Sequence, residues 1–337
     1  MFHLNLVPEV HAEGKTLKFL GIYSKNREEW IMSELAGISQ GVTTVPLYDT
    51  LGPDAAEFVI NQTELTTIAC AGSYVPSLLM LKKAGRTPNL KNLIIFDKID
   101  DLECGAECDL KIYEFQELIK METGISAEQM PNKPLADDIY MLCYTSGTTG
   151  DPKAAKLTHK NLLSVATSAN YAGVVFEHTD TMISYLPLAH SFEKVLFALC
   201  LVKGVRIGYY SGNVLKITDD CAVLQPTLFP SVPRLYNRIF DKINARLEEL
   251  TGVRSYLANR AVNSKLYYLK EQGTLDYAFY DRAVCSKFRA ILGGKVRFMV
   301  TGSAPISTDV LNFLKVCFCC PVLEGYGQTE CSAACTI

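Results

Sequence analysis

The sequence lacks most features that mark membrane, secreted or nucleic-acid-binding proteins. Its longest clean apolar run, Val195 to Val202, is far shorter than the roughly 20 residues that a membrane-spanning helix needs. The first residues, Met1 to Leu6, lack the charged and apolar regions of a signal peptide. The formal net charge of −3 gives no electrostatic reason to bind nucleic acid. These absences favour a cytoplasmic protein without a membrane anchor and without a nucleic-acid partner.

Two common phosphate-binding patterns and a zinc-type cysteine pattern are also missing. The chain has neither the Gly-x4-Gly-Lys-Ser/Thr loop nor the three-glycine dinucleotide fingerprint, which disfavours a generic nucleoside triphosphatase. The 12 cysteines show no repeating spacing and are typical of reduced, buried thiols. Cys317 and Cys320 form a C-x-x-C pair, but no second pair follows and the segment around them is apolar. We therefore predict no metal site at this pair.

What the sequence does have is a large apolar fraction and alternating secondary structure. With 48% hydrophobic residues in 337, the chain can bury a substantial core. Strand-like and helix-like segments alternate, which predicts an α/β fold of two doubly wound, mostly parallel sheets flanked by helices. Residues 98–137 are polar with weak periodicity, and we interpret them as a connection to the second sheet. The predicted subdomains therefore cover about 1–137 and 138–337.

The predicted elements follow from apolar periodicity and from capping or breaking residues. The strands are Leu17–Tyr23, Val42–Tyr48, Thr66–Ala71, Leu93–Phe96, Ile139–Cys143, Met182–Leu186, Val205–Tyr210, Ala222–Phe229, Val296–Val300 and Pro321–Leu323. The helices are a segment containing Glu28, Glu29 and Trp30, capped by Ser24 or Asn26 and ended by Gly41, then 54–61, 75–83, Lys160–Tyr171 capped by Thr158, Phe192–Lys203, Arg234–Leu250, 254–271, 275–292 and Thr308–Cys319.

The segment from Tyr144 to Lys153, YTSGTTGDPK, has the chemistry of a phosphate-binding loop. Its glycines let the backbone approach an anion, and successive N–H groups can form an anion-binding concavity. Hydroxyl groups and the Lys153 ammonium add further donors. The segment follows a predicted strand, and open α/β sheets bind ligands at the carboxyl ends of their strands. Alone, such a segment is more often a solvated turn.

Three further segments carry candidate binding groups at predicted strand ends. Leu186–Glu193 presents His190, which can bind an anion, position a carboxylate or simply cap the next helix. Val300–Pro305 is a small-residue turn that can line a flat base or merely lead into a helix. Gly325–Glu330 places an aromatic ring, a hydroxyl and a carboxylate within six residues; a tight loop with a solvated glutamate is the alternative. A carboxylate there can bind Mg²⁺, which prefers oxygen ligands shared with phosphates.

Together, the four segments resemble the motifs of the adenylate-forming superfamily, which includes acyl-CoA synthetases, luciferases and the adenylation domains of peptide synthetases. Other segments resemble the eukaryotic long-chain fatty acyl-CoA synthetases, and the match runs from about Lys15 onward. These segments are Val45–Gly52, Leu186–Glu193, Pro226–Tyr236 and Phe298–Pro305. The family usually has glycine where Ala154 stands and an apolar residue where Lys156 stands.

The resemblance implies a long-chain fatty acid–CoA ligase that uses ATP, Mg²⁺ and coenzyme A. It implies catalytic roles for Thr145, Lys153, His190 and Glu330, with Glu330 binding the metal ion and His190 beside the reacting carboxylate. Tyr326 would stack on adenine, and Thr329 would contact the α-phosphate. The full set of nucleotide-binding residues implied is Thr145, Ser146, Gly147, Thr148, Thr149, Gly150, Lys153, Ser303, Ala304, Pro305, Gly325, Tyr326, Gly327, Gln328 and Thr329.

The chain ends at Ile337, seven residues beyond Glu330, whereas the family continues with a ribose-binding aspartate, a hinge and a small C-terminal domain. We therefore expect a partial adenylation domain with impaired activity. The alternative is a catalytically silent fragment that binds nucleotide or acyl chains, or that associates with a full-length relative. The resemblance places the parent family at the cytosolic face of the endoplasmic reticulum or mitochondrial outer membrane. Acyl chain length and oligomeric state stay open.

Overall fold

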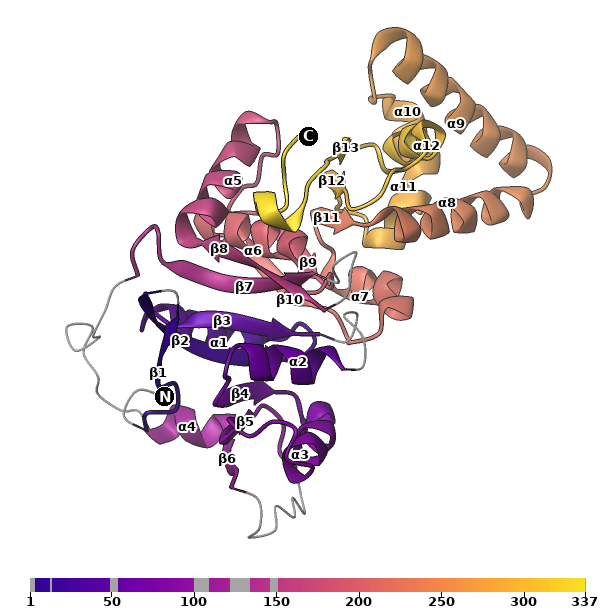
Figure 1. Cartoon of the computed structure of the whole chain (residues 1–337). Helices are drawn as coiled ribbons and strands as arrows, with labels where there is room; N and C mark the ends of the chain where they lie inside the picture. The colour runs from indigo at the N-terminus through magenta and orange to yellow at the C-terminus, as the bar shows by residue number, and fades with distance from the viewer. Residues whose placement is uncertain are drawn as a thin grey trace. The chain divides into compact units, whose positions relative to one another are not determined.

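The computed structural model describes residues 4–12, 14–48, 54–99, 109–121, 134–145 and 151–336. The chain forms two compact units, each with one sheet (Figure 1). The first unit comprises Met1–Ser164 and Pro187–Lys194, and the second comprises Val165–Leu186 and Val195–Ile337. The predicted boundary near residue 137 therefore falls inside the first unit. None of the helices in the described ranges is both long and apolar enough to cross a membrane.

The sheet of the first unit has the strand order β6-β5-β4-β2-β3-β7-β8, with β1 beside β2. All neighbours are parallel except the β1–β2 and β7–β8 pairs. The strands are β1 (Glu9–Ala12), β2 (Lys15–Tyr23), β3 (Thr43–Leu47), β4 (Thr67–Cys70), β5 (Asn92–Ile95), β6 (Lys111–Glu114), β7 (Ile139–Thr145) and β8 (Lys153–Thr158). The helices are α1 (Glu28–Ile38), α2 (Ala55–Gln62), α3 (Val75–Lys83), α4 (Phe115–Met121) and the start of α5 (His159–Tyr171).

Most predicted elements of this unit are confirmed, but the predicted connection over residues 98–137 is wrong. It contains β6 and α4, and β6 extends the first sheet beside β5. The next strand, β7, pairs with β3, so it too belongs to the first sheet. The sequence does not predict β6, because the strand is short and its side chains are half-exposed. An edge strand can pair with its neighbour without a clear apolar periodicity.

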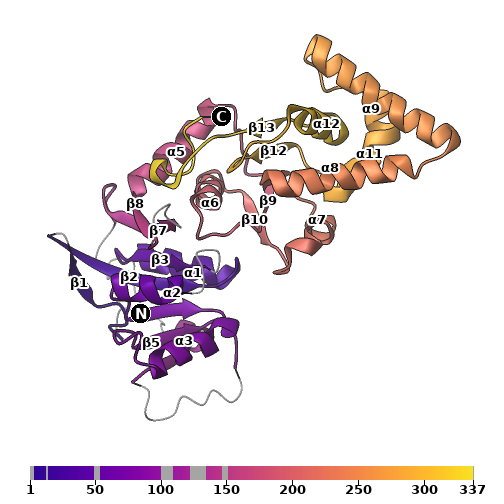
Figure 2. The ribbon, with the colours of Figure 1, turned by 45° about the vertical axis from the view of Figure 1, so that its right-hand side comes forward.

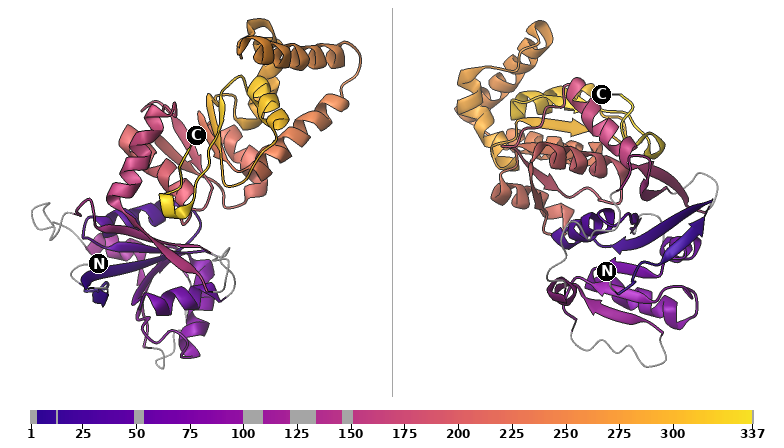
Figure 3. Two further views of the ribbon diagram at one scale, coloured as in Figure 1. Left: turned by 45° about the horizontal axis from the view of Figure 1, so that its top comes forward. Right: turned by 90° about the vertical axis from the view of Figure 1, so that its left-hand side faces the viewer.

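The core of the first unit follows from the two faces of its strands. Alternate side chains point to opposite faces, so Phe19 joins the cluster that buries α2 and α3, while Leu20 and Ile22 point the other way. On that second face, Leu20 lies 3.9 Å from where a side chain at Gly37 of α1 would begin. Helices therefore cover both faces of the sheet, as the doubly wound prediction requires. The N-terminal strands β1 and β2, indigo, are clearest in the right-hand view of Figure 3.

The second unit has a fully parallel sheet of order β10-β9-β11-β12-β13. Its strands are β9 (Thr181–Ser184), β10 (Arg206–Tyr209), β11 (Leu228–Ser231), β12 (Phe298–Thr301) and β13 (Val322–Glu324). Its helices are most of α5 and α6 (Ser191–Lys203), then α7 (Ile217–Leu224), α8 (Pro233–Glu248), α9 (Gly252–Gln272), the short α10 (Ala278–Tyr280) and α11 (Ser286–Arg289), and α12 (Thr308–Phe318).

Two predictions in the second unit are wrong in detail. The strand predicted over 222–229 is the end of α7 followed by β11, with Gln225 in a left-handed conformation between them. The helix predicted over 275–292 is broken into short α, π and 3₁₀ turns. The periodicity of α8 is confirmed, since Leu235, Ile239, Ile243 and Leu247 are all buried. Helix α12 packs against both α8 and α9 (Figure 2).

A buried carboxylate ties together the starts of three strands in this sheet. Asp180, which is 1% exposed, accepts hydrogen bonds from Arg297 Nε at 2.7 Å and from the Thr227 hydroxyl at 2.6 Å. Burial opposes ionisation of Asp180, but these donors outweigh it and hold the pKa of the carboxyl below its usual range. Because the three residues precede β9, β11 and β12, the network fixes the relative register of these strands.

Candidate functional site

The predicted phosphate segment joins two antiparallel strands of the first unit. Thr145 ends β7, Lys153 begins β8, and the two are cross-strand partners. The Thr145 hydroxyl donates to the carbonyl oxygen of Lys153 at 3.4 Å. Ser146, Gly147, Thr148, Thr149 and Gly150 lie outside the described residues. The structure therefore shows that the two ends of the segment lie side by side at the carboxyl end of β7.

Lys153 lies at the start of β8, where its side chain can contact a ligand. The residue is exposed and forms no ion pair within the part of the chain that the structure describes. Lys156, three residues along the same strand, points to the opposite face because strand side chains alternate. Ala154 lies in regular strand pairing opposite Tyr144, so a methyl group is accommodated there without a left-handed backbone.

His190 caps helix α6, which was one of the three roles that the sequence allowed for it. Its Nδ1 accepts a hydrogen bond from the backbone N–H of Phe192 at 3.2 Å, at the start of α6. A neutral ring with Nδ1 as acceptor carries its proton on Nε2, which is then a donor. Burial lowers the pKa of the His190 imidazole, and the positive end of a helix also disfavours the charged ring. His190 can therefore offer an uncharged donor at neutral pH.

Two residues that sequence reasoning did not place near His190 hold the turn that contains it. The Asn26 side-chain oxygen accepts from the backbone N–H of Leu188 at 3.0 Å, and Cys143 Sγ lies 3.4 Å from the carbonyl oxygen of Ala189. The prediction that Asn26 or Ser24 caps α1 is wrong, because Arg27 occupies that position without a side-chain cap. No local pattern signals the Asn26 contact, since 162 positions separate its partners.

The other two predicted segments lie side by side in the second unit. They follow the carboxyl ends of β12 and β13, which are adjacent parallel strands with Thr301 opposite Glu324. The backbone N–H of Gly325 donates to Thr301 O at 2.8 Å, and that of Ile306 donates to a Glu324 carboxylate oxygen at 3.3 Å. Ser303, Ala304 and Pro305 are exposed, and Ser303 has a left-handed φ of 73°. Such a backbone is often found at ligand sites.

The segment from Gly325 to Glu330 is held in a compact turn. Tyr326 forms an antiparallel bridge with Thr336, and its hydroxyl accepts from the Gln328 amide at 2.7 Å. Tyr326 is 60% exposed, so much of the residue is accessible to a ligand. Gly327 admits no side chain, since a Cβ there would lie 1.3 Å from the carbonyl oxygen of Ala333. Thr329 and Glu330 begin a 3₁₀ turn.

Glu330 presents an exposed carboxylate that forms no ion pair with the residues the structure describes. Carboxylate oxygen is a ligand that Mg²⁺ prefers, and the ion commonly shares such a ligand with phosphates and water. The donor chemistry of Glu330 therefore fits the metal role predicted for it.

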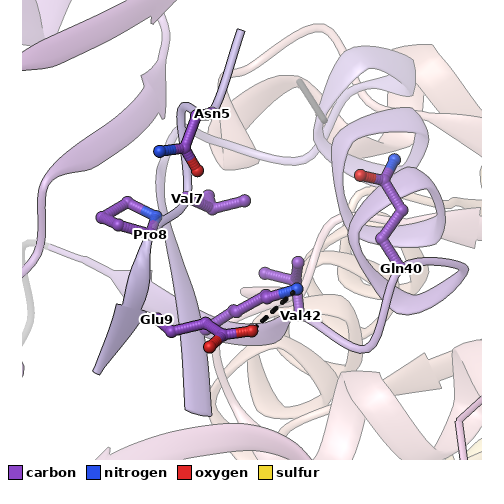
Figure 4. Close-up of a pocket in the computed structure, with 7 residues that line it drawn as sticks. Asn5, Val7, Pro8, Glu9, Gln40 and Val42 are labelled. Atoms are coloured by element: carbon purple, nitrogen blue, oxygen red, sulfur yellow. Dashed lines mark ion pairs between the residues drawn. The ribbon is translucent and has the colours of Figure 1, made fainter. Parts of the chain in front are cut away.

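A cavity at the N-terminal edge of the first unit lies apart from the predicted site residues (Figure 4). It has a volume of about 520 Å³ and contains none of the predicted site residues. Lys18 and Glu9 form a 3.6 Å ion pair on its wall. Its lining mixes polar side chains with the apolar Val7, Pro8 and Val42, an arrangement without the few convergent polar groups typical of a catalytic pocket.

Comparison with protein families decides the classification. The profile of the family described as "AMP-binding enzyme" matches residues 14–337. The chain belongs to this AMP-binding family. Both strand-end segments of the second unit and the segment between β7 and β8 fall within the matched range, as does His190. The resemblance inferred from the motifs is therefore confirmed at the level of the family.

Several curated proteins are similar to this chain over most of its length. Long-chain-fatty-acid–CoA ligase 5 of Mus musculus is 40% identical over 326 residues, covering 95% of this chain and 47% of the relative. Long chain acyl-CoA synthetase 7, peroxisomal, of Arabidopsis thaliana is 40% identical over 319 residues, covering 93% and 44%. The chain thus spans about half the length of the curated relatives it matches.

Solved structures share the fold of this AMP-binding chain. The adenylation domain of a carboxylate reductase from Mycobacterium chelonae superposes with a TM-score of 0.72 at 21% identity, covering 92% of this chain and 47% of that one. The A domain of a carboxylic acid reductase from Segniliparus rugosus, in complex with AMP and a co-purified carboxylic acid, gives 0.68 at 20% identity, covering 96% and 50%. The predicted fold class, two mostly parallel sheets flanked by helices, is confirmed.

Proposed function

We propose that this chain is the nucleotide- and acyl-binding part of a long-chain fatty acid–CoA ligase. The observation that carries the proposal is the 40% identity, across 95% of the chain, to a protein that bears that name. Because the chain spans about half of such relatives, the activity of the whole protein and its substrates, a long-chain fatty acid, ATP and coenzyme A, are all part of the proposal.

The proposed reaction has two displacement steps. A carboxylate oxygen of the fatty acid attacks the α-phosphorus of ATP, the bond to the bridging oxygen breaks and pyrophosphate leaves. The thiolate of coenzyme A then attacks the acyl carbon, and AMP leaves with the electrons of the broken bond. Neither step needs a protein nucleophile. The protein must instead position the reactants and neutralise charge that develops on phosphate oxygens.

In the first unit, Thr145 and Lys153 would bind the β- and γ-phosphates together with residues 146–150. The exposed Lys153 ammonium supports this role, because it is not neutralised by a carboxylate in the described residues. His190 would hold the reacting carboxylate through Nε2–H. A neutral donor suits that position, since a cation there would lower the nucleophilicity of the carboxylate.

In the second unit, Tyr326 would stack on adenine, with Ser303, Ala304 and Pro305 on the other side of the base. The exposure of Tyr326 and its anchored hydroxyl support this role, because a side chain held in place loses little conformational entropy on binding. The Thr329 hydroxyl would donate to the α-phosphate, while Gly325, Gly327 and Gln328 hold the turn. Glu330 would hold Mg²⁺, which supplies charge neutralisation on the phosphate oxygens when it is bound.

The nucleotide part of the proposal is tested by Lys153→Ala. We expect the affinity for ATP to fall about 10- to 100-fold, because a hydrogen bond to a charged group contributes roughly 1.5–3 kcal/mol. The affinity for AMP, which lacks the β- and γ-phosphates, should not change. Titration calorimetry with both nucleotides measures the two affinities.

Lys156→Ala is the matched control for this experiment. It removes the same charge from the opposite face of the same strand and should leave the affinity for ATP within about twofold of the starting protein. Equal losses of ATP affinity in both variants would show that any nearby positive charge has the same effect. An unchanged ATP affinity in Lys153→Ala would show that this segment does not bind the nucleotide.

The acyl part is tested with sulfamate mimics of acyl-adenylate that carry either a palmitoyl or an acetyl group. Each methylene group transferred from water adds about 0.8 kcal/mol, so a site built for long chains should bind the palmitoyl mimic far more tightly. Equal affinities for the two mimics would reject a long-chain substrate while leaving adenylate binding intact.

A further inference from the structure

Two cysteines lie in sulfur contact in the turn that follows β13. The Sγ atoms of Cys331 and Cys335 are 2.8 Å apart. The antiparallel bridge between Tyr326 and Thr336 folds the chain back on itself and brings the two residues together. A disulfide bond is about 2.05 Å long, so the sulfurs need to approach by less than about 1 Å for a bond to form.

This pair differs from the other cysteines that the structure describes. Cys335 is exposed and Cys331 is partly exposed, whereas every other described cysteine except Cys319 is buried. Cys319 approaches Cys285, but that contact is shared with a lysine and a carboxylate: Lys265 Nζ lies 3.2 Å from Cys319 Sγ, and Asp281 lies 3.3 Å from it. Only the Cys331–Cys335 pair therefore combines sulfur contact with access for an oxidant among the described cysteines.

We propose that Cys331 and Cys335 form a reversible disulfide that closes the turn over residues 326–336. The inference goes beyond the proposed ligase function and does not depend on it, because the sulfur contact exists whatever the turn binds. The closed ring is short and exposed. Disulfides of this kind are reduced readily and serve regulation more often than structural support.

The oxidation is a two-electron step with a hydroperoxide as the oxidant. The Cys331 sulfur, which lies 3.1 Å from both the backbone nitrogen and the carbonyl oxygen of Gln328, releases its proton and attacks a peroxide oxygen. The O–O bond breaks, giving a sulfenic acid and an oxygen leaving group that takes up the released proton, which for hydrogen peroxide gives water. The Cys335 sulfur then attacks the sulfenic sulfur, and the S–O bond breaks. The hydroxide that leaves takes the Cys335 proton and departs as a second water.

The bond would fix the turn in the arrangement seen here. Cys335 and Thr336 both donate backbone hydrogen bonds to Tyr326 O, and Ala333 donates to Gln328 O at 2.9 Å. A covalent link between residues 331 and 335 limits the opening of all these bonds. The turn carries Tyr326 and Glu330, so oxidation alters the freedom of the groups proposed to bind nucleotide.

The test is mass spectrometry of the full chain after treatment with hydrogen peroxide. Cleavage after Glu330 releases residues 331–337, which contain only these two cysteines. We expect this peptide to lose two hydrogens on oxidation, to resist alkylation and to regain both hydrogens with dithiothreitol. Oxygen addition to either sulfur, or a peptide that stays fully reduced, would overturn the proposal.

Cys335→Ser and Cys331→Ser are the paired variants, and both residues are accessible enough for substitution to leave the fold intact. Amide hydrogen exchange over residues 326–336 should slow at least severalfold on oxidation of the starting chain and should not slow in either variant. Slowing in the serine variants, or its absence in the oxidised starting chain, would contradict the proposed closure. Neither readout uses nucleotide, so failure here is separate from failure of the proposed function.

Discussion

The ring of His190 is fixed by the helix that follows it, and this constraint decides its protonation. With Nδ1 bonded to the Phe192 N–H, protonation of the ring would place two donors against each other and a positive charge at a helix start. Burial lowers the pKa of the ring further. The hydrogen bond by which His190 caps α6 therefore also leaves its Nε2–H as an uncharged donor. The proposed reaction needs such a donor.

The depressed pKa of His190 predicts how stability varies with pH. The unfolded histidine titrates near 6.5, above the folded value. Between the two pKa values the unfolded chain binds more protons, so the free energy of unfolding falls as the pH drops below about 6.5. His190→Asn keeps a cap acceptor without a titrating ring and should reduce this slope, as measured by urea unfolding between about pH 5 and 7.

His159 provides the comparison, because burial also lowers its pKa and it lies outside the proposed site. His159→Asn should reduce the slope without changing the affinity for acyl-adenylate mimics. A His190→Asn chain with the pH dependence of the starting protein would show that the ring titrates normally in the folded state.

The residue scale is also where sequence reasoning was most incomplete. Thr158 was predicted to cap α5 and does so, since its hydroxyl accepts from the Asn161 N–H at 3.1 Å. Asn26 was assigned a cap of the same local kind, but its side chain bonds Leu188 instead. A local pattern can predict a bond between residues three apart, whereas a bond across 162 positions depends on the tertiary fold.

At the scale of elements, a buried ion pair joins α1 to the first turn of α6. Lys194 Nζ donates to both carboxylate oxygens of Glu34 at 2.8 and 2.9 Å, and the Tyr140 hydroxyl donates to the same carboxylate at 2.7 Å. Both charged side chains are fully buried. Lys194 also lies 3.9 Å from the centre of the Trp30 ring, a favourable cation–π arrangement.

Replacing one residue of the Glu34–Lys194 pair should lower the free energy of unfolding far more than replacing both. Lys194→Met leaves Glu34 as an uncompensated buried charge and should lower the free energy of unfolding by about 3–5 kcal/mol. The double variant Glu34→Leu with Lys194→Met should recover most of that loss, because two well-packed apolar side chains often replace a buried pair without cost. Urea unfolding measures both, and a single variant as stable as the starting chain would contradict the account.

The elements that escaped prediction share a physical cause. Strand β8 reads Lys-Ala-Ala-Lys-Leu-Thr, in which only Leu157 is buried, so its sequence offers no apolar alternation. It is a strand because β7 presents an unpaired edge to it. By contrast, α8 and α12 were predicted to within a few residues, since periodic apolar positions specify a helix that packs on a core.

At the scale of the whole molecule, each unit holds one part of the proposed nucleotide site. The segment between β7 and β8 and His190 belong to the first unit, and the segments after β12 and β13 belong to the second. The motif order along the chain predicted which strand ends carry these groups. The central claim is that both parts bind the same ATP.

A bifunctional ATP with one photoreactive group on adenine and another on the γ-phosphate tests this claim most directly. The account predicts that light joins a peptide containing Lys153 to a peptide containing Tyr326 through a single nucleotide, and that excess ATP abolishes the product. Peptide mapping by mass spectrometry identifies the link. Labelling of only one of these peptides, or of both by separate nucleotides with no cross-linked pair, would contradict the claim.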